Sequence, residues 1–347
     1  MTDTLTNNQE RSVNKEYKVG VAILRFYMAF MVVCTHLGGK ALFELGGLFY
    51  TFQGFHVPTF MMLSFVLCGQ YYLEPTKEGM LKRLLRIVIP FITWGVLAFL
   101  FGLILWDLSF KDLLWQLFSG FPVNTPLWYL VDMLWISILF WIIRLLSNRK
   151  IFIIIISFLA VFSIVAQYTG LNLLMFGELT YNIKWTLGRV IEMIPYATIG
   201  IIASMFLPLL NKLEMKHHVI IFLACGVILV AAMLIRWKLI SYSLEGFDYQ
   251  GAFPIFITII LILTGFTNPL NFIKNVTFIN IIKWITAFTL GVFCMHSIVG
   301  QFVILVFNKC SWPIENVIVA SITYVICYGV SFLINLIPCK YVKMTVN

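Results

Sequence analysis

The sequence predicts an all-α integral membrane protein with about ten transmembrane helices. Of its 347 residues, 61% are hydrophobic and 11% are charged, whereas soluble domains are about 25% charged. The mean hydropathy is +0.95. Apolar runs of about 20 residues, the length that a helix needs to cross a bilayer, recur along the chain. These runs are too long for the strands of a membrane β-barrel, which excludes that class.

The predicted helices leave little of the chain outside the membrane. The longest polar gaps, 107–126 and 168–186, leave no room for a soluble domain. We therefore expect one membrane domain, 18–338, between an N-terminal tail, 1–17, and a C-terminal tail, 339–347. The first helix carries an arginine and lacks a small-residue cleavage site, so we expect it to be retained. The ten predicted helices are 18–37, 47–73, 86–106, 127–147, 151–170, 187–208, 217–236, 251–267, 281–306 and 315–338. The second and ninth are long enough to tilt, break or extend past the bilayer.

The basic residues of the loops predict that both termini are cytoplasmic. With the N-terminus inside, sixteen of the 24 Lys and Arg residues fall on the cytoplasmic side, seven fall outside, and Arg25 lies within a helix. This bias follows the positive-inside rule. It also accounts for the net charge of +9 without a nucleic-acid partner. The sequence does not indicate an oligomeric state.

Arg25 and His36 are the first candidates for chemistry. Eleven residues turn a helix by three turns plus about 20°, so the two side chains share one face, about 16 Å apart along the axis. A charged residue inside a membrane usually faces a protein interior or a wet cavity and serves function. Histidine can act as a general base near neutral pH. The alternative is an arginine that snorkels to lipid phosphates beside a histidine at a helix end.

Three basic residues, Lys82, Arg83 and Arg86, stand where the chain enters the third predicted helix. Arg83 and Arg86 share a helix face, and a helix start attracts anions. A phosphate-rich cytosolic ligand would suit this site. Positive-inside anchoring alone would also explain these residues.

Other polar and aromatic groups fall inside predicted helices, and each has a structural alternative. His56 precedes Pro58, which kinks a helix. Intramembrane acids are functional candidates by default, although Arg189 and Glu192 could simply pair. Trp128 and Tyr129 could form an interfacial belt or stack on sugars. Asp132 is a further intramembrane acid, and His296 could be a hydrogen-bonded interior residue.

Several site classes find no support in the sequence. The seven cysteines have no paired spacing, so neither a disulfide framework nor a zinc site is expected. Nucleotide-binding, metalloprotease and serine-hydrolase motifs are also missing.

Five segments, taken in order, resemble the motifs of the acyltransferase-3 family of bacterial membrane proteins, over about residues 18–338. They are Arg25-x10-His36, Val57-Pro58-Thr59-Phe60-Met61-Met62-Leu63-Ser64, Lys82-Arg83-Leu84-Leu85-Arg86-Ile87-Val88-Ile89-Pro90, Leu127-Trp128-Tyr129-Leu130 and Gly291-Val292-Phe293-Cys294-Met295-His296. Two positions depart from the family pattern: Phe65 replaces the usual glycine after the serine, and Phe293 replaces the usual tyrosine three residues before the histidine. The hydrolase-like domain that some members carry is missing, so the chain resembles a stand-alone member.

The resemblance implies an enzyme of the bacterial cytoplasmic membrane. Such enzymes move an acyl group, by default acetyl, from cytosolic acyl-coenzyme A to a hydroxyl of a cell-surface polysaccharide or lipid-linked glycan. Arg83, Arg86 and Lys82 would bind the donor, Arg25 would line its passage, and His36 would activate the hydroxyl. The acceptor would contact Trp128, Tyr129, Glu192 and His296. No metal is implied.

Two other functions remain open at this point. A transporter or flippase of lipid-linked sugars or small solutes would suit ten helices with buried charge, although the repeat symmetry typical of transporters is not evident. A membrane-embedded sensor or assembly partner would need no catalytic histidine.

Overall fold

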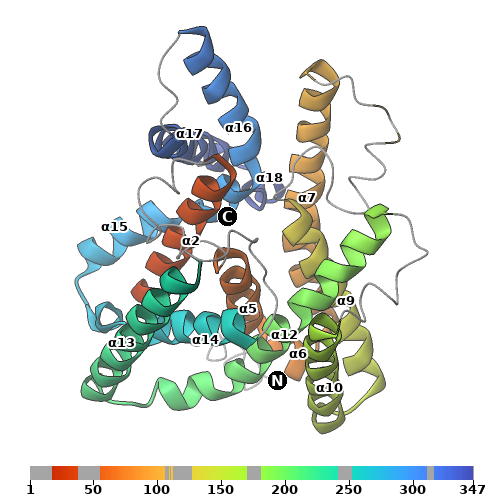
Figure 1. The fold of residues 1–347 in the computed structure, drawn as a ribbon, viewed down its shortest axis with the longest axis vertical. Helices are drawn as coiled ribbons and strands as arrows, with labels where there is room; N and C mark the ends of the chain where they lie inside the picture. Colours follow the sequence, from red (N-terminus) through yellow and green to blue (C-terminus); the bar gives the residue numbers. More distant parts are fainter. Residues whose placement is uncertain are drawn as a thin grey trace, which may run out of the picture.

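The computed structural model describes residues 18–37, 55–105, 109, 111, 127–169, 181–240, 252–310 and 316–346. Throughout these residues the chain forms helices and turns (Figure 1). The helices are α2 (Val19–Leu37), α5 (His56–Cys68), α6 (Gln70–Leu73), α7 (Lys77–Leu105), α9 (Trp128–Leu146), α10 (Arg149–Tyr168), α12 (Tyr181–Leu210), α13 (Met215–Ile240), α14 (Ala252–Thr267), the 3₁₀ helix η2 (Pro269–Phe272), α15 (Val276–Thr286), α16 (Thr289–Lys309), α17 (Asn316–Leu336) and α18 (Lys340–Lys343).

The predicted membrane architecture is confirmed. Among the described residues, nine helical segments are long and apolar enough to cross a bilayer, and α5 is a shorter apolar helix of 13 residues. Together they match the ten predicted segments, although residues 47–54 of the second lie outside the described residues. The ninth segment breaks between α15 and α16, as its length allowed. The side of the membrane on which the termini lie stays a prediction.

Helix α7 begins earlier than expected, at Lys77 rather than at residue 86. Hydropathy finds only the membrane-embedded part of a helix, whereas the basic residues before it are good helix formers and extend the helix outward. Lys82 and Arg83, which precede the predicted start at residue 86, therefore lie within α7 together with Arg86.

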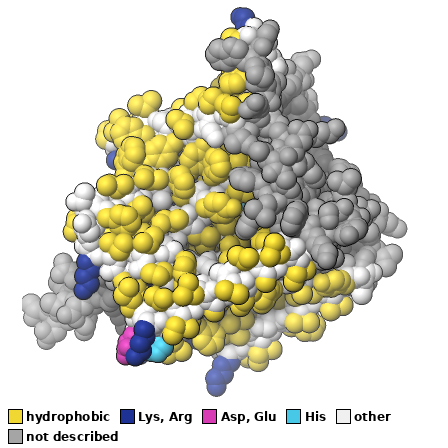
Figure 2. All heavy atoms as spheres, turned by 60° about the vertical axis from the view of Figure 1, so that its left-hand side comes forward, with side chains coloured by type: hydrophobic (Ala, Val, Ile, Leu, Met, Phe, Trp, Pro, Cys, Tyr) yellow, Lys and Arg dark blue, Asp and Glu magenta, His cyan; other side chains and the backbone are white. Residues whose placement is uncertain are grey.

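The outer surface is apolar where it would meet lipid. Figure 2 shows a broad hydrophobic face on which the few visible charged side chains lie toward the rim. One outer face of α13 contributes exposed side chains to the surface, namely Ile220, Leu223, Val227, Val230 and Leu234. In water such a surface would aggregate. In a bilayer it is the expected lipid-facing surface.

Helix α5 lies near the centre of the molecule, in contact with α2, α12 and α14 (Figure 1). It packs tightly on α12 at Gly200, where a Cβ atom would lie 2.5 Å from the Met62 carbonyl oxygen. Small residues of this kind allow helices to pack closely in membranes. The contact fixes the position of α5, which carries several of the candidate site residues.

A buried asparagine holds the start of α2. The Gly20 backbone N–H donates to Oδ1 of Asn271, at 2.7 Å, and Nδ2 of Asn271 donates to the carbonyl oxygens of Gly265 and Phe266. The first N–H groups of a helix have no partner within the helix. Asn271 therefore satisfies the first turn of α2 and joins it to the last turn of α14.

The end of the chain packs into the domain. The Trp94 indole N–H donates to the Thr345 carbonyl at 2.8 Å, and the Gly291 N–H donates to the Val346 carbonyl at 3.2 Å. Val346 is fully buried. Thr345 and Val346, which we expected in a tail, are therefore packed against the helices. The membrane side of this segment stays a prediction.

We expect Asn271→Leu to destabilise the protein although it conserves the side-chain volume. It would leave the Gly20 N–H and the two α14 carbonyls without this partner, at about 1–3 kcal/mol for each buried group. Thermal unfolding in detergent would measure the loss. A melting temperature equal to that of the wild type would show that these groups find other partners.

Candidate active site

Three of the arginines expected in the site converge on one cavity of about 210 Å³. Arg25 comes from α2, and Arg83 and Arg86 come from α7. Three cations around one space inside a membrane domain create a strong attraction for an anionic ligand. The other lining residues are Phe60, Leu63, Ser64, Leu67, Cys68, Ile87, Tyr129, Leu130, Met133, Thr289, Leu290 and Phe293.

Arg83 is the most buried of the three cations, with 6% of its surface exposed. Its Nη1 donates to Ser64 Oγ at 2.8 Å and to Cys68 Sγ at 3.3 Å. By distance and angle its Nε and Nη2 make no hydrogen bond within the described residues, although the Tyr72 hydroxyl is close enough to interact with the guanidinium as a weak hydrogen-bonding neighbour. Nε and Nη2 form one edge of the guanidinium, which suits a bidentate bond to a phosphate or carboxylate.

The phenylalanine that departs from the family pattern contacts this arginine. Phe65 is fully buried, and the Arg83 guanidinium lies 5.0 Å from the centre of its ring. A cation over an aromatic face is stabilised by the ring quadrupole. The glycine usual at this position could not make this contact.

Arg25 and Tyr129 also line the cavity. Arg25 Nη2 donates to Thr289 Oγ1 at 3.0 Å. Tyr129 interacts electrostatically with both Arg25 and Arg83, and its ring centre lies 5.3 Å from that of Phe293. Tyr129, which we expected near the acceptor, therefore lies among the arginines.

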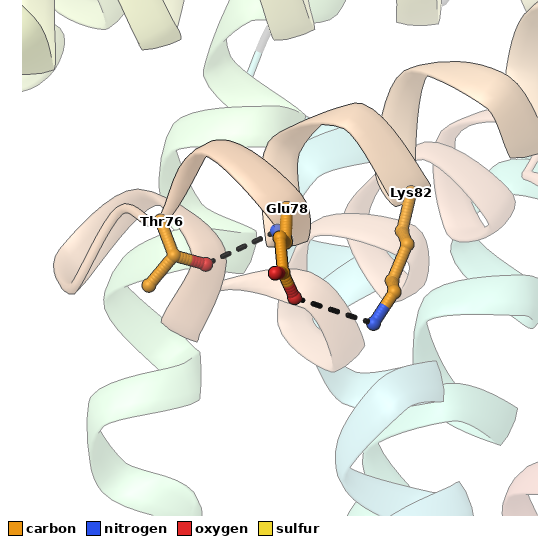
Figure 3. A network of polar contacts seen from close by, with 4 residues as sticks. Thr76, Glu78 and Lys82 are labelled. Carbon is orange, nitrogen blue, oxygen red and sulfur yellow. Dashed lines mark hydrogen bonds and ion pairs between the residues drawn. The ribbon is translucent and has the colours of Figure 1, made fainter.

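Lys82 lies apart from the cavity lining, in the first turns of α7 (Figure 3). Its Nζ is 4.0 Å from Glu78 Oε2, and both side chains are well exposed. Thr76 accepts a hydrogen bond from the Gly79 N–H and so caps this helix start. Arg86 is also exposed, but it shares the Arg83 face of the helix and lines the cavity.

His36 and His296 lie side by side, with ring centres 5.0 Å apart. His36 is exposed at the end of α2, and His296 is fully buried in α16. In each ring Nδ1 lies within hydrogen-bonding distance of a backbone carbonyl, that of Val32 for His36 and that of Phe293 for His296. A carbonyl can only accept, so in the neutral rings Nδ1 carries the proton and Nε2 carries a lone pair. Both Nε2 atoms can therefore accept a proton.

The shared face predicted for Arg25 and His36 is confirmed by their partners. Arg25 bonds to Thr289 and His36 lies against His296, and both partners belong to α16. These two partners are seven residues apart, which places them on one helix face. The two helices run in the same direction along this contact.

A third histidine, His56, joins this pair. It is 1% exposed, and neither ring nitrogen has a hydrogen-bond partner within the described residues. It interacts electrostatically with both His36 and His296. Within the described part of the chain these side chains are not arranged to hold a metal ion. Sequence analysis leaves His56 open between a functional residue and a residue beside a kink, because nothing local shows which helices meet there.

An aromatic cluster of Phe60, Tyr129 and Phe293 adjoins both the cavity and the histidines. The ring centres are 5.3–6.4 Å apart, and Phe293 lies 6.2 Å from His296. All three rings line the cavity. The tyrosine usual at position 293 would bring a hydroxyl into this cluster, where the present chain has a hydrocarbon edge.

Trp128 and Glu192 belong to a separate cluster around Arg189, in which Glu192 is half-buried. Arg189 Nε lies 3.6 Å from Asp132 Oδ2, with both side chains buried, and the Arg189 guanidinium lies 4.9 Å from the Trp128 ring centre. Glu192 interacts electrostatically with Asp132 and Arg189. Trp128 and Glu192 do not line the cavity of the three arginines.

The sequence model of the acyltransferase-3 family, which describes an acyltransferase domain, matches residues 19–336 of the chain. The chain belongs to the acyltransferase-3 family. It is therefore a multi-pass membrane acyltransferase, and the matched range covers every helix from α2 to α17. Neither the curated proteins nor the solved structures include a match to the chain.

We expect Arg189→Leu to destabilise this acyltransferase by about 3–5 kcal/mol, because it leaves the buried Asp132 and the half-buried Glu192 without this cation. Arg189→Lys keeps the charge and should lose less stability. Thermal unfolding of both variants in the same detergent would compare them. Equal stability of wild type and Arg189→Leu would mean that the acids carry a proton or find another cation.

Proposed function

We propose that this enzyme moves an acyl group, by default acetyl, from cytosolic acyl-coenzyme A to a hydroxyl of a cell-surface polysaccharide or lipid-linked glycan. It would do so in the cytoplasmic membrane of a bacterium. The observation that carries this proposal is the unpartnered, buried N–H edge of Arg83 in a cavity that adjoins a histidine pair through shared aromatic rings.

The three arginines suit the phosphate end of the donor. Coenzyme A carries several phosphates, and the free edge of Arg83 can bind one of them through two parallel hydrogen bonds. Arg86, which is exposed, and Arg25, which is half-buried, add two further charges to the cavity lining. Lys82 would act only at longer range, by raising the local positive potential.

The distance between the two parts of the site fits a long, thin donor. Arg25 and His36 are about 16 Å apart along α2. With the phosphates at the arginines, the pantetheine arm would pass the aromatic cluster and bring the thioester to the histidines. Phe60 and Phe293 offer an apolar path to such an arm.

His36 would act as the general base. Its Nε2 would take the proton of the acceptor hydroxyl as the oxygen attacks the thioester carbonyl. When the carbon–sulfur bond breaks, the same proton would pass to the departing sulfur and give the free thiol. His296 Nε2 would accept a hydrogen bond from the acceptor.

The aromatic and acidic residues would contact the donor arm and the acceptor. Tyr129 would contact the donor arm and the reacting end of the acceptor, since its ring lies against Phe293. Trp128 and Glu192 would shape the acceptor site from the neighbouring cluster of α9 and α12. An aromatic face and a carboxylate are suitable contacts for a sugar ring and its hydroxyls.

Donor binding provides the first test. We expect the purified protein to be stabilised by acetyl-coenzyme A, and Arg83→Ala to weaken binding at least tenfold, since a hydrogen bond to a charged group contributes about 1.5–3 kcal/mol. Lys82→Ala is the matched control, because it removes a cation of the same helix that does not line the cavity. It should change the affinity for acetyl-coenzyme A little. If the wild type binds no acyl-coenzyme A, the proposed donor is wrong.

The base is tested separately. We expect His36→Ala to bind acetyl-coenzyme A as the wild type does and to lose about 10²–10⁴-fold in transfer rate. Acyl transfer to membrane glycans, followed with radiolabelled acetyl-coenzyme A in membrane vesicles, would measure it. Transfer by His36→Ala at the wild-type rate would assign the base to another group.

A further inference from the structure

We propose that His56 is a catalytic residue that donates a hydrogen bond to the oxyanion formed when the acceptor hydroxyl attacks the thioester. This inference rests on the proposed function. It supplies the one group that acyl transfer needs and that the arginines and His36 do not provide, a donor beside the carbonyl oxygen.

The packing of two helices places His56 at the level of the histidine pair. Phe60 of α5 contacts Phe293 of α16, with ring centres 6.1 Å apart. His56 lies one turn before Phe60, and His296 lies about one turn after Phe293. Because His56 and His296 also interact electrostatically, the two helices run in opposite directions and both histidines lie beyond the aromatic contact.

The backbone assigns different hydrogen-bonding roles to the three rings. His36 and His296 use Nδ1–H on main-chain carbonyls and present Nε2 lone pairs, so in the neutral state both can only accept there. His56 has no such bond within the described residues, and both of its nitrogens are buried. A neutral imidazole always carries one N–H. His56 is therefore the ring of this cluster that can offer a donor.

A buried N–H without a partner is costly, which points to a ligand as its partner. His56 is also the first residue of α5, where the helix dipole favours negative charge. The ring N–H and the positive end of the helix would act together on an oxyanion near His36.

The proposed transfer moves one proton, from the acceptor hydroxyl to the departing sulfur. The hydroxyl proton moves to His36 Nε2 while the new carbon–oxygen bond forms, and the carbonyl oxygen becomes an anion that accepts the His56 N–H. Collapse of this intermediate breaks the carbon–sulfur bond, and the proton on His36 passes to the sulfur. His56 keeps its own proton throughout.

The test compares two unreactive donor analogues, so it needs no identified acceptor. S-acetonyl-coenzyme A keeps a planar ketone, and its trifluoromethyl counterpart hydrates readily to a tetrahedral, easily ionised centre. We expect the wild type to prefer the tetrahedral analogue. His56→Phe, which fills the same space without an N–H, should bind it about 10²–10³-fold more weakly and bind the planar ketone as before.

Two further variants separate an oxyanion donor from a structural histidine. His56→Gln retains N–H donors and should recover part of the preference for the tetrahedral analogue. The control variant is His218→Phe, which removes another buried histidine. His218 lies on α13, against Phe272 of η2, and its replacement should change the affinity for neither analogue.

The outcomes distinguish the two proposals. If the wild type binds neither analogue, the donor of the proposed function is wrong. If it binds both and His56→Phe keeps the wild-type preference, only the role of His56 is overturned. Equal weakening of both analogues by His56→Phe and His56→Gln would make His56 structural and would also overturn the inference.

Discussion

A guanidinium held inside a membrane domain is the constraint around which this structure is organised. A charged side chain at the centre of a bilayer costs about 3 kcal/mol on insertion scales, and Arg83 is almost fully buried. Helix α5 offsets this cost from one side, through the Ser64 hydroxyl, the Cys68 thiol and the Phe65 ring. The close contact of α5 with α12 at Gly200 holds these groups in place. The cavity therefore depends on a helix that is too short to cross the bilayer alone.

Helix α16 joins the two halves of the site. Thr289 holds Arg25, Phe293 belongs to the aromatic cluster, and His296 lies against His36. These residues are spaced by three or four, so they follow one face of the helix. The start of α16 is fixed by the Val346 carbonyl, which accepts from the Gly291 N–H. The end of the chain thus helps to position the helix that carries both parts of the site.

Relationships within one helix are predictable from the sequence. The common face of Arg25 and His36 follows from helical geometry alone, and so does that of Arg83 and Arg86. Sequence reasoning did not separate Trp128 from Tyr129. These neighbours point about 100° apart on α9, and one contacts Arg189 while the other lies among the cavity arginines. The role of His56 also stays open in the sequence, because its neighbours come from α2 and α16.

The sequence by itself determined that this chain crosses the membrane many times as helices. Bilayer thickness and the cost of unpaired backbone groups leave few alternatives for runs of this length and apolarity. It also determined which charged residues need a protein environment. Only the tertiary structure decided which of them meet, because side-chain contacts between helices depend on packing and not on spacing along the chain. That packing brings three arginines to one cavity and three histidines together in a cluster beside it. It also places Trp128 and Glu192 in a separate ionic cluster.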